Sequence, residues 1–276
     1  MITDARLDEL VREDAPHGDL TTDSLGIGSL PGRIEFTARQ PLVLAGGEEA
    51  TRLFARVGCS ARLKQASGTS LQPGAVILEA EGSAAALHLG WKVSLHLLEQ
   101  LSGIATRTRR IVDAARAGAS GREVPVAATR KGFPGTRDLA LLGVRAGGGI
   151  AHRLGLSDSI LIFAQHAVFL GAGGLREAVA RVRMREPERK VVVEVANLVD
   201  ALEAVRAGAD VIQVEKLAPD AFAKVVQACP GVLVAATGGI DESNAAAYAA
   251  AGAALLVTSA PYAAKPAEIR AAMMTS

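Results

Sequence analysis

The feature that most constrains the fold is a series of six apolar runs in the second half of the chain. They lie at Val124–Thr129, Ser159–Phe163, Val191–Val195, Asp210–Val214, Val232–Thr237 and Ala254–Ser259. Each run is rich in Val, Ile, Leu or Ala without strict alternation, as expected for strands buried on both faces. Helix-periodic stretches such as Gly174–Arg185, Leu198–Ala207 and Glu242–Ala250 separate most of them. The pattern therefore predicts parallel strands joined by crossover helices.

About six β-α units in tandem favour an incomplete β/α barrel, because a complete barrel has about eight. A doubly wound parallel sheet is the alternative architecture. The first run is not followed by Gly-x-Gly-x-x-Gly, the sequence expected where such a sheet binds a dinucleotide. We therefore predict an α/β protein with a barrel-type domain.

The first part of the chain has a different sequence pattern. Short extended segments punctuated by Pro and Gly lie at residues 32–39, 41–47 and 75–82. A helix-like run from Ala84 to Leu101 follows them, so the pattern indicates a small α+β domain. We predict that this domain spans residues 1–106, that the barrel spans residues 107–265, and that the tail, residues 266–276, packs with the first domain.

Composition narrows the class of protein. Hydrophobic residues make up 49% and charged residues 21% of the chain, as in globular proteins. The net charge of +1 lacks the basic surplus of a nucleic-acid binder, and Cys59 and Cys229 lack the spacing of a disulfide framework or a metal site. The uncharged stretch 245–264 is mostly Ala and Gly and contains Pro261, unlike a membrane helix. We expect a soluble cytoplasmic protein with no nucleic-acid or membrane partner.

Charged and polar residues gather where the predicted strands end. In chain order they are Thr129-Arg130-Lys131, His152-Arg153 before the second run, Phe163 with Gln165-His166, Glu194, Glu215-Lys216, Thr237-Gly238-Gly239 and Thr258-Ser259. Because the carboxyl ends of barrel strands converge, we expect these residues to face one cavity. Each group also has a purely structural explanation, such as an ion pair for each carboxylate and a tight turn for the glycines.

Together these residue types favour a phosphorylated ligand. Gly238 and Gly239, just before a predicted helix, can offer backbone amides to a phosphate. Glu194 and Glu215 suit a magnesium ion that is shared with substrate oxygens. Transfer of a phosphoribosyl group fits this set, because pyrophosphate needs cations and carboxylates stabilise the positive charge on the ribosyl group in the transition state.

Several motifs then point to a family. They are Glu13-Asp14, Gly18-Asp19-Leu20-Thr21-Thr22, Leu101-Ser102-Gly103-Ile104-Ala105-Thr106, Thr129-Arg130-Lys131, Pro134-Gly135-Thr136-Arg137 and His152-Arg153-Leu154-Gly155-Leu156-Ser157-Asp158. In this order, and over nearly the whole chain, they resemble the motifs of quinolinate phosphoribosyltransferases. The resemblance implies an N-terminal open-faced sandwich, an incomplete barrel, and a homodimer or higher multiple whose active site lies at the subunit interface. It also implies magnesium as cofactor and a reaction of 5-phosphoribosyl 1-pyrophosphate with quinolinate that yields nicotinate mononucleotide.

Departures from the family pattern concentrate where the acceptor would bind. Gln100 stands where the family has Arg, Trp91-Lys92 where it has Glu-Arg, and Phe163 where it has Lys. Glu215-Lys216 replaces Asp-Asn, and Thr237 replaces Ser. This combination resembles the ModD branch, proteins associated with molybdenum transport. With fewer cationic side chains, the acceptor pocket can bind about one carboxylate of the acceptor. Phe163 can stack on a flat ring.

The leading interpretation is therefore a magnesium-dependent phosphoribosyltransferase with an altered acceptor pocket. The resemblance implies that Glu194 and Glu215 bind the ribose hydroxyls and magnesium, and that Lys131 binds the pyrophosphate. It implies that the acceptor is bound by Arg130, His152, Arg153, Phe163 and Gln100. The backbone of Gly238, Gly239 and Ser259 is expected to bind the 5-phosphate, and Thr237 and Thr258 are expected to be substrate-binding residues as well. The alternatives are a working quinolinate phosphoribosyltransferase of NAD synthesis and a non-catalytic binder of a nucleotide or an oxyanion.

Overall fold

The structure is a computed structural model that describes residues 2–275, with residue 172 described by its backbone alone. Its contacts divide the chain into two compact units. The first unit contains residues up to 109 together with 133–148 and the C-terminal segment from 262. The second unit contains residues 110–132 and 149–261.

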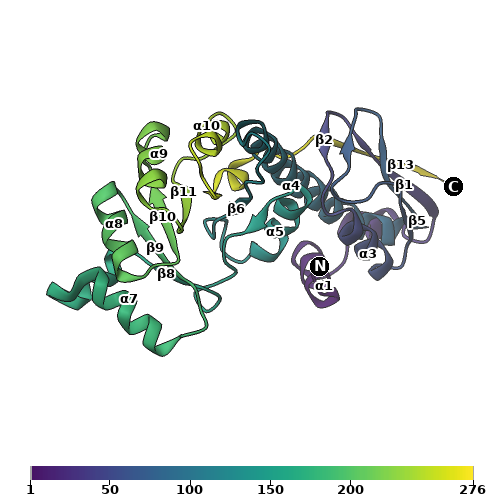
Figure 1. Cartoon of the computed structure of the whole chain (residues 1–276). Helices are drawn as coiled ribbons and strands as arrows, with labels where there is room; N and C mark the ends of the chain where they lie inside the picture. The colour runs from purple at the N-terminus through teal and green to yellow at the C-terminus, as the bar shows by residue number, and fades with distance from the viewer. Residues whose placement is uncertain (1, 276) are drawn as a thin grey trace. The chain divides into compact units, whose positions relative to one another are not determined.

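The first unit is built on a four-stranded antiparallel sheet in the order β13-β1-β5-β3 (Figure 1). Its strands are β1 (Pro31–Ala38), β3 (Ser60–Leu63), β5 (Val76–Ser83) and β13 (Ile269–Thr275). Burial alternates along β1, with Ile34 and Phe36 fully buried, so one face of the sheet packs and the other stays accessible. The buried face meets α3 (Gly47–Arg56), where Phe36 and Phe54 pack edge to face at 5.8 Å.

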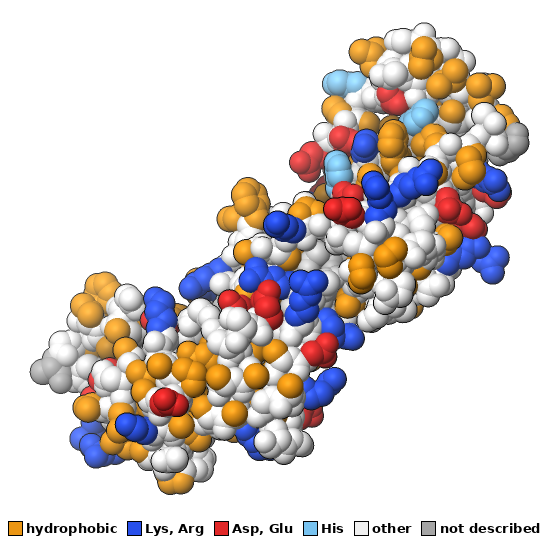
Figure 2. Space-filling view, turned by 90° about the horizontal axis from the view of Figure 1, so that it is seen from above, with side chains coloured by type: hydrophobic (Ala, Val, Ile, Leu, Met, Phe, Trp, Pro, Cys, Tyr) orange, Lys and Arg blue, Asp and Glu red, His pale blue; other side chains and the backbone are white. Residues whose placement is uncertain are grey.

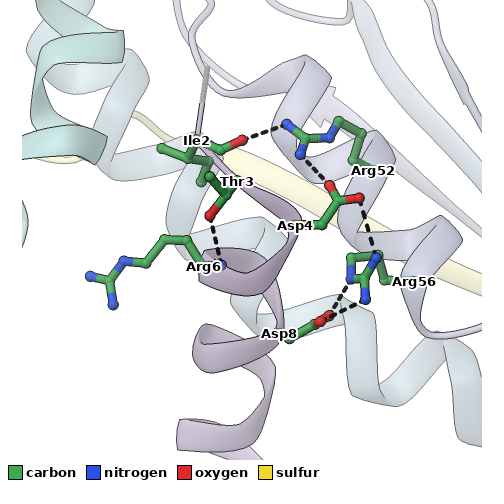
Figure 3. Close-up of polar contacts among 7 residues, drawn as sticks. All are labelled: Ile2, Thr3, Asp4, Arg6, Asp8, Arg52 and Arg56. Carbon is green, nitrogen blue, oxygen red and sulfur yellow. Dashed lines mark hydrogen bonds and ion pairs between the residues drawn. The ribbon is translucent and has the colours of Figure 1, made fainter.

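The first unit contains further helices and a small ribbon besides this sheet. They are α1 (Asp4–Asp14), α2 (Leu20–Leu25), the ribbon of β2 (Leu42–Val43) with β4 (Ser70–Leu71), most of α4 (Ala84–Gly118) and α5 (Arg137–Ala146). Two arginines of α3 hold α1 in place (Figure 3). Arg52 pairs with Asp4 and donates to the Ile2 carbonyl oxygen at 3.0 Å, and Arg56 donates to Asp8 at 2.6 Å. These ion pairs are exposed, so they orient α1 more than they stabilise it.

The second unit contains a parallel sheet of seven strands in the order β7-β6-β12-β11-β10-β9-β8. The strands are β6 (Val126–Ala128), β7 (Ile150–Ala151), β8 (Ile160–Ile162), β9 (Val191–Val195), β10 (Val211–Glu215), β11 (Leu233–Thr237) and β12 (Leu255–Thr258). The connecting helices are α6 (Ala164–Ala167), α7 (Gly174–Arg185), α8 (Leu198–Ala207), α9 (Pro219–Ala228) and α10 (Ala245–Ala250), with 3₁₀ turns at η1 (Val168–Gly173) and η2 (Ala260–Ala263). Within the described residues β7 and β8 do not pair with each other, so the barrel is incomplete.

Side chains of the parallel strands alternate between two apolar environments. Ile212, Val214 and Val193 belong to the large core that includes α7 to α10. Ala127, Ala235 and Val257 form a separate small cluster on the other face of the sheet, inside the curve of the barrel. Small side chains suit this interior because strands that curve round bring their inner faces close together.

The predicted fold class is confirmed: the protein is α/β, with an N-terminal sheet domain and a parallel half-barrel. Local details differ. The helix expected at 84–101 continues to Gly118, so the domain boundary expected after residue 106 lies inside α4. The helix expected from Glu242 begins at Ala245, and β7 was not expected. The division at 106 and 107 stays a prediction, although the C-terminal tail does form β13 beside β1.

The surface mixes both signs of charge. On the face that Figure 2 shows, acidic side chains lie among the basic ones, in keeping with the net charge of +1. None of the helices between residues 2 and 275 combines the length and the hydropathy needed to cross a membrane.

Candidate active site

A pocket opens at the carboxyl ends of the parallel strands of the second unit. The predicted residues that line it are Arg130, Lys131, His152, Arg153, Phe163, Glu194, Glu215, Thr237 and Gly238. Strands β6, β7, β8, β9, β10 and β11 each supply at least one of these residues, either within the strand or just after it. The parallel arrangement thus brings residues up to 128 positions apart in the sequence to one hollow, Thr129 and Val257 being the extremes.

Seven residues that were predicted for the site do not line this pocket: Gln100, Gln165, His166, Lys216, Gly239, Thr258 and Ser259. Gln100 is exposed on α4 in the other compact unit. Gly239 and Ser259 follow strand ends but lie outside the lining. The Thr258 hydroxyl is buried, donates to the carbonyl oxygen of Ile240 and accepts from the amide of Ala260 at 3.0 Å. Thr258 therefore ties two loops together.

The acidic side of the pocket holds two carboxylates. Half-buried Glu194 accepts a hydrogen bond from Gln213, with Nε2 and Oε2 2.7 Å apart, and Glu215 pairs with Lys216 at 3.1 Å. Burial raises the pKa of Glu194 above its usual value, and the charge of Glu215 raises it further, while the Gln213 hydrogen bond opposes both. A cation beside two such carboxylates relieves their repulsion.

The pocket also has a cationic part. Arg153 is only 8% exposed, and Arg130 is half-buried beside it. Burial lowers the pKa of His152, and the charges of Arg153 and Arg130 lower it further, so the imidazole is neutral at pH 7. Two guanidinium groups next to a neutral imidazole suit a carboxylate and a polar ring atom on the same ligand.

Phe163 gives this part of the pocket an aromatic wall. Its ring stacks on His166, with centroids 5.6 Å apart, and the Arg153 guanidinium lies 5.9 Å from its centroid. His166 Nδ1 accepts from the Phe163 amide at 2.9 Å, which holds the imidazole in place. A planar ligand can therefore meet both a ring face and a cation here.

Two neighbouring backbone segments at the rim adopt left-handed conformations. Gly238 and Gly239 have φ of +84° and +78°, and Lys216 has φ of +54°. The Lys216 amide donates to the Thr237 carbonyl oxygen at 2.8 Å, which joins the ends of β10 and β11. Such strain in a non-glycine residue is typical of functional sites.

Replacing Gly238 by Ala should strain this turn. The new Cβ would lie 2.6 Å from Lys216 Cγ and 3.1 Å from Lys216 N. We expect the free energy of unfolding to fall by about 2 kcal/mol, measured by urea denaturation. Gly231→Ala is the matched control, because Gly231 has φ of +80° but nothing within 4 Å, and it should lose only about 1 kcal/mol. Equal losses would contradict the proposed crowding at Gly238.

Sequence reasoning missed Gln213, which lies in β10 and lines the pocket. A signal was present, because Gln213 is two residues before Glu215 and side chains two apart in a strand share a face. Clusters of three or more His, Cys, Asp or Glu arranged to hold a metal are absent from the described part of the chain. The two carboxylates alone are a donor set for a hard cation whose other ligands come from substrate and water.

Comparisons with known proteins agree over nearly the whole chain. The family domains "Quinolinate phosphoribosyl transferase, N-terminal domain" and "C-terminal domain" match residues 19–102 and 104–271. A Rhodobacter capsulatus protein, "Putative pyrophosphorylase ModD", is 47% identical over 89% of this chain and 95% of its own. Human nicotinate-nucleotide pyrophosphorylase (carboxylating) is 35% identical over 87% of this chain and 80% of its own. NadC from Streptococcus pyogenes, at 26% identity, superposes with a TM-score of 0.91 over 100% of this chain and 99% of that one.

The half-barrel, its pocket and these relatives define the protein as an enzyme that transfers a phosphoribosyl group. More narrowly, the chain belongs to the quinolinate phosphoribosyltransferase family, as its motifs predicted, and it resembles the ModD branch.

Proposed function

We propose that the enzyme is magnesium-dependent and transfers the phosphoribosyl group of 5-phosphoribosyl 1-pyrophosphate to a small aromatic acceptor that is less acidic than quinolinate. The observation that carries the proposal is the composition of one pocket. Two carboxylates, Glu194 and Glu215, share the pocket with the cations Arg130 and Arg153 and the ring of Phe163. Carboxylates suit the sugar and its metal ion, and the cations with the aromatic ring suit a flat anion.

The donor half of the pocket fits magnesium. Glu194 and Glu215 would hold the ion, because they are two carboxylates in one pocket, where burial and, after it, the charge of Glu215 raise the pKa of Glu194. When bound, the ion supplies positive charge to the pyrophosphate leaving group. The exposed Lys131 side chain also lines the pocket and can bind the pyrophosphate as a mobile cation. The 5-phosphate would bind to the amide of Gly238, which lines the pocket, and to those of Gly239 and Ser259, which lie outside the lining.

In the proposed reaction the bond from ribosyl C1 to the pyrophosphate oxygen breaks, and its electron pair leaves with pyrophosphate. A ring nitrogen of the acceptor forms the new bond to C1. Glu194, ionised and fixed by its hydrogen bond from Gln213, stabilises the positive charge that develops on the ribosyl ring. Arg130 and Arg153 orient the acceptor through its anionic group.

The altered acceptor half gives a testable preference. With Phe163 where the family has Lys, a pyridine monocarboxylate should have a higher kcat/KM than quinolinate, which carries two carboxylates. Phe163→Lys should raise kcat/KM for quinolinate about tenfold, because it adds a cation for the second carboxylate. Phe163→Leu is the control that removes the ring without adding charge. Quinolinate turnover by the unmodified enzyme above that of every monocarboxylate would make it a quinolinate phosphoribosyltransferase of NAD synthesis.

The family resemblance also supports a homodimer whose active site includes residues of both subunits. Helix α2 of the first unit carries Leu20 and Leu25, which are 81% and 65% exposed and would gain from burial in an interface. Light scattering of the purified protein should give twice the chain mass of 28.4 kDa, or a higher multiple of it. A monomer at micromolar concentration would contradict this part of the proposal.

A further inference from the structure

One buried amide occupies the apolar interior of the half-barrel. Gln213 is only 3% exposed, and its neighbours Ile212 and Val214 belong to the outer core against the helices. The Gln213 side chain therefore lies on the inner face of β10. Buried apolar side chains of this interior include Ala127, Ala235 and Val257. A polar group in such surroundings is unfavourable unless its hydrogen bonds are made.

The two ends of this amide have different surroundings. Nε2 donates to Glu194 Oε2 at 2.7 Å. Oε1 is buried and has no hydrogen-bond partner among the residues that the structure describes. A buried carbonyl oxygen without a partner destabilises the fold relative to an apolar side chain of similar size. Glu194 thus explains the Nε2 group of Gln213, whereas Oε1 needs a hydrogen-bond donor from outside the chain.

The ligand of the proposed function carries such donors. Gln213 lines the same pocket as Glu194 and Glu215. The last torsion of a glutamine side chain is soft, so a modest rotation turns Oε1 toward the pocket without a change in β10. The hydroxyls of a ribosyl ring are hydrogen-bond donors, and ionised carboxylates and the amide oxygen are acceptors.

The geometry points to Gln213 as a positioning and specificity-determining residue of the phosphoribosyl site. Its Nε2 holds the carboxylate of Glu194 in place, and its Oε1 accepts a hydrogen bond from a hydroxyl of the ribosyl ring. This inference rests on the proposed function. A site that binds a hydroxyl in this way rejects the analogue without it, because the buried acceptor is then left unpaired.

Calorimetry with ribose 5-phosphate and its 2-deoxy and 3-deoxy analogues tests this role. The unmodified enzyme should bind ribose 5-phosphate more tightly than at least one analogue. Gln213→Met should reduce that preference about tenfold, because one net hydrogen bond to the hydroxyl is lost. Gln213→Glu should weaken all three ligands through its charge yet keep the preference, since a carboxylate oxygen still accepts. Gln227→Met, at an exposed position of α9, is the matched control and should change nothing.

The outcomes separate this inference from the proposed function. An unmodified enzyme that binds neither ribose 5-phosphate nor the pyrophosphate donor contradicts the proposed function itself. Binding without any preference among the three sugars, or a preference that Gln213→Met retains, overturns only the role of Gln213. The Tm of Gln213→Met should stay close to that of the unmodified enzyme, because the unpaired oxygen is gone but Glu194 loses its hydrogen bond. Gln213→Leu repeats both measurements in a second apolar shape, and a lower Tm with an unchanged preference would make Gln213 a packing residue alone.

Discussion

Glu194→Gln should lower kcat for phosphoribosyl transfer by about 100- to 1000-fold. The change keeps the shape of the side chain but removes the charge that lies in the pocket beside Glu215. The positive charge that develops on the ribosyl ring then loses a stabilising carboxylate, and the cation expected between the two carboxylates loses one of its two charged protein ligands. Initial rates with saturating donor and magnesium measure this effect.

Glu203→Gln is a suitable control, because Glu203 lies on α8, outside the pocket, and should leave the rate unchanged. Melting curves of both variants exclude unfolding as the cause. A Glu194→Gln enzyme that retains more than a tenth of the unmodified kcat would remove Glu194 from the proposed transition state.

Gly118→Ala should destabilise the second unit by about 3 kcal/mol, although helix propensity alone predicts that it stabilises by about 1 kcal/mol. Gly118 is the last residue of α4. An added Cβ would lie 2.0 Å from the backbone oxygen of Ala246 in α10 and 2.6 Å from its carbonyl carbon. Backbone cannot yield as a flexible side chain can, so α4 and α10 would have to separate.

Urea denaturation of Gly118→Ala tests whether the steric clash or the gain in helix propensity is larger, since the two change the free energy of unfolding in opposite directions. Gly155→Ala is the control: Gly155 has no left-handed conformation, and the nearest atom to its new Cβ would be 4.0 Å away. It should change the free energy of unfolding by less than about 0.5 kcal/mol. A Gly118→Ala variant as stable as the unmodified protein would show that α10 does not pack closely on the end of α4.

The sequence predicted the parallel strands well, because a strand buried on both faces needs an unbroken apolar run. It did not predict β7 or β13. Strand β7 has only two residues, and the segment Ile269–Thr275 lacks the alternation of a half-buried strand. Both strands depend on pairing with distant segments, β6 and β1. Such pairing is a tertiary effect that local pattern cannot reveal.

The candidate site was predictable where charge interrupts an apolar run. Glu194 stands out in Val-Val-Val-Glu-Val because an ionised group in a buried strand needs a partner. Gln213 did not stand out, since a neutral amide in a strand can have many partners. The hydroxyl of Thr258 bonds to the backbone, and no periodicity in the sequence decides between that and the pocket.

The pocket should bind a phosphoribosyl donor together with a divalent cation. Calorimetry of the unmodified enzyme with 5-phosphoribosyl 1-pyrophosphate, with and without magnesium, tests this binding. We predict saturable binding with one site per chain, tightened at least tenfold by magnesium and abolished in a Glu194→Ala, Glu215→Ala double variant. Binding that is absent, or that is unchanged by removal of both carboxylates, would contradict the assignment of this pocket.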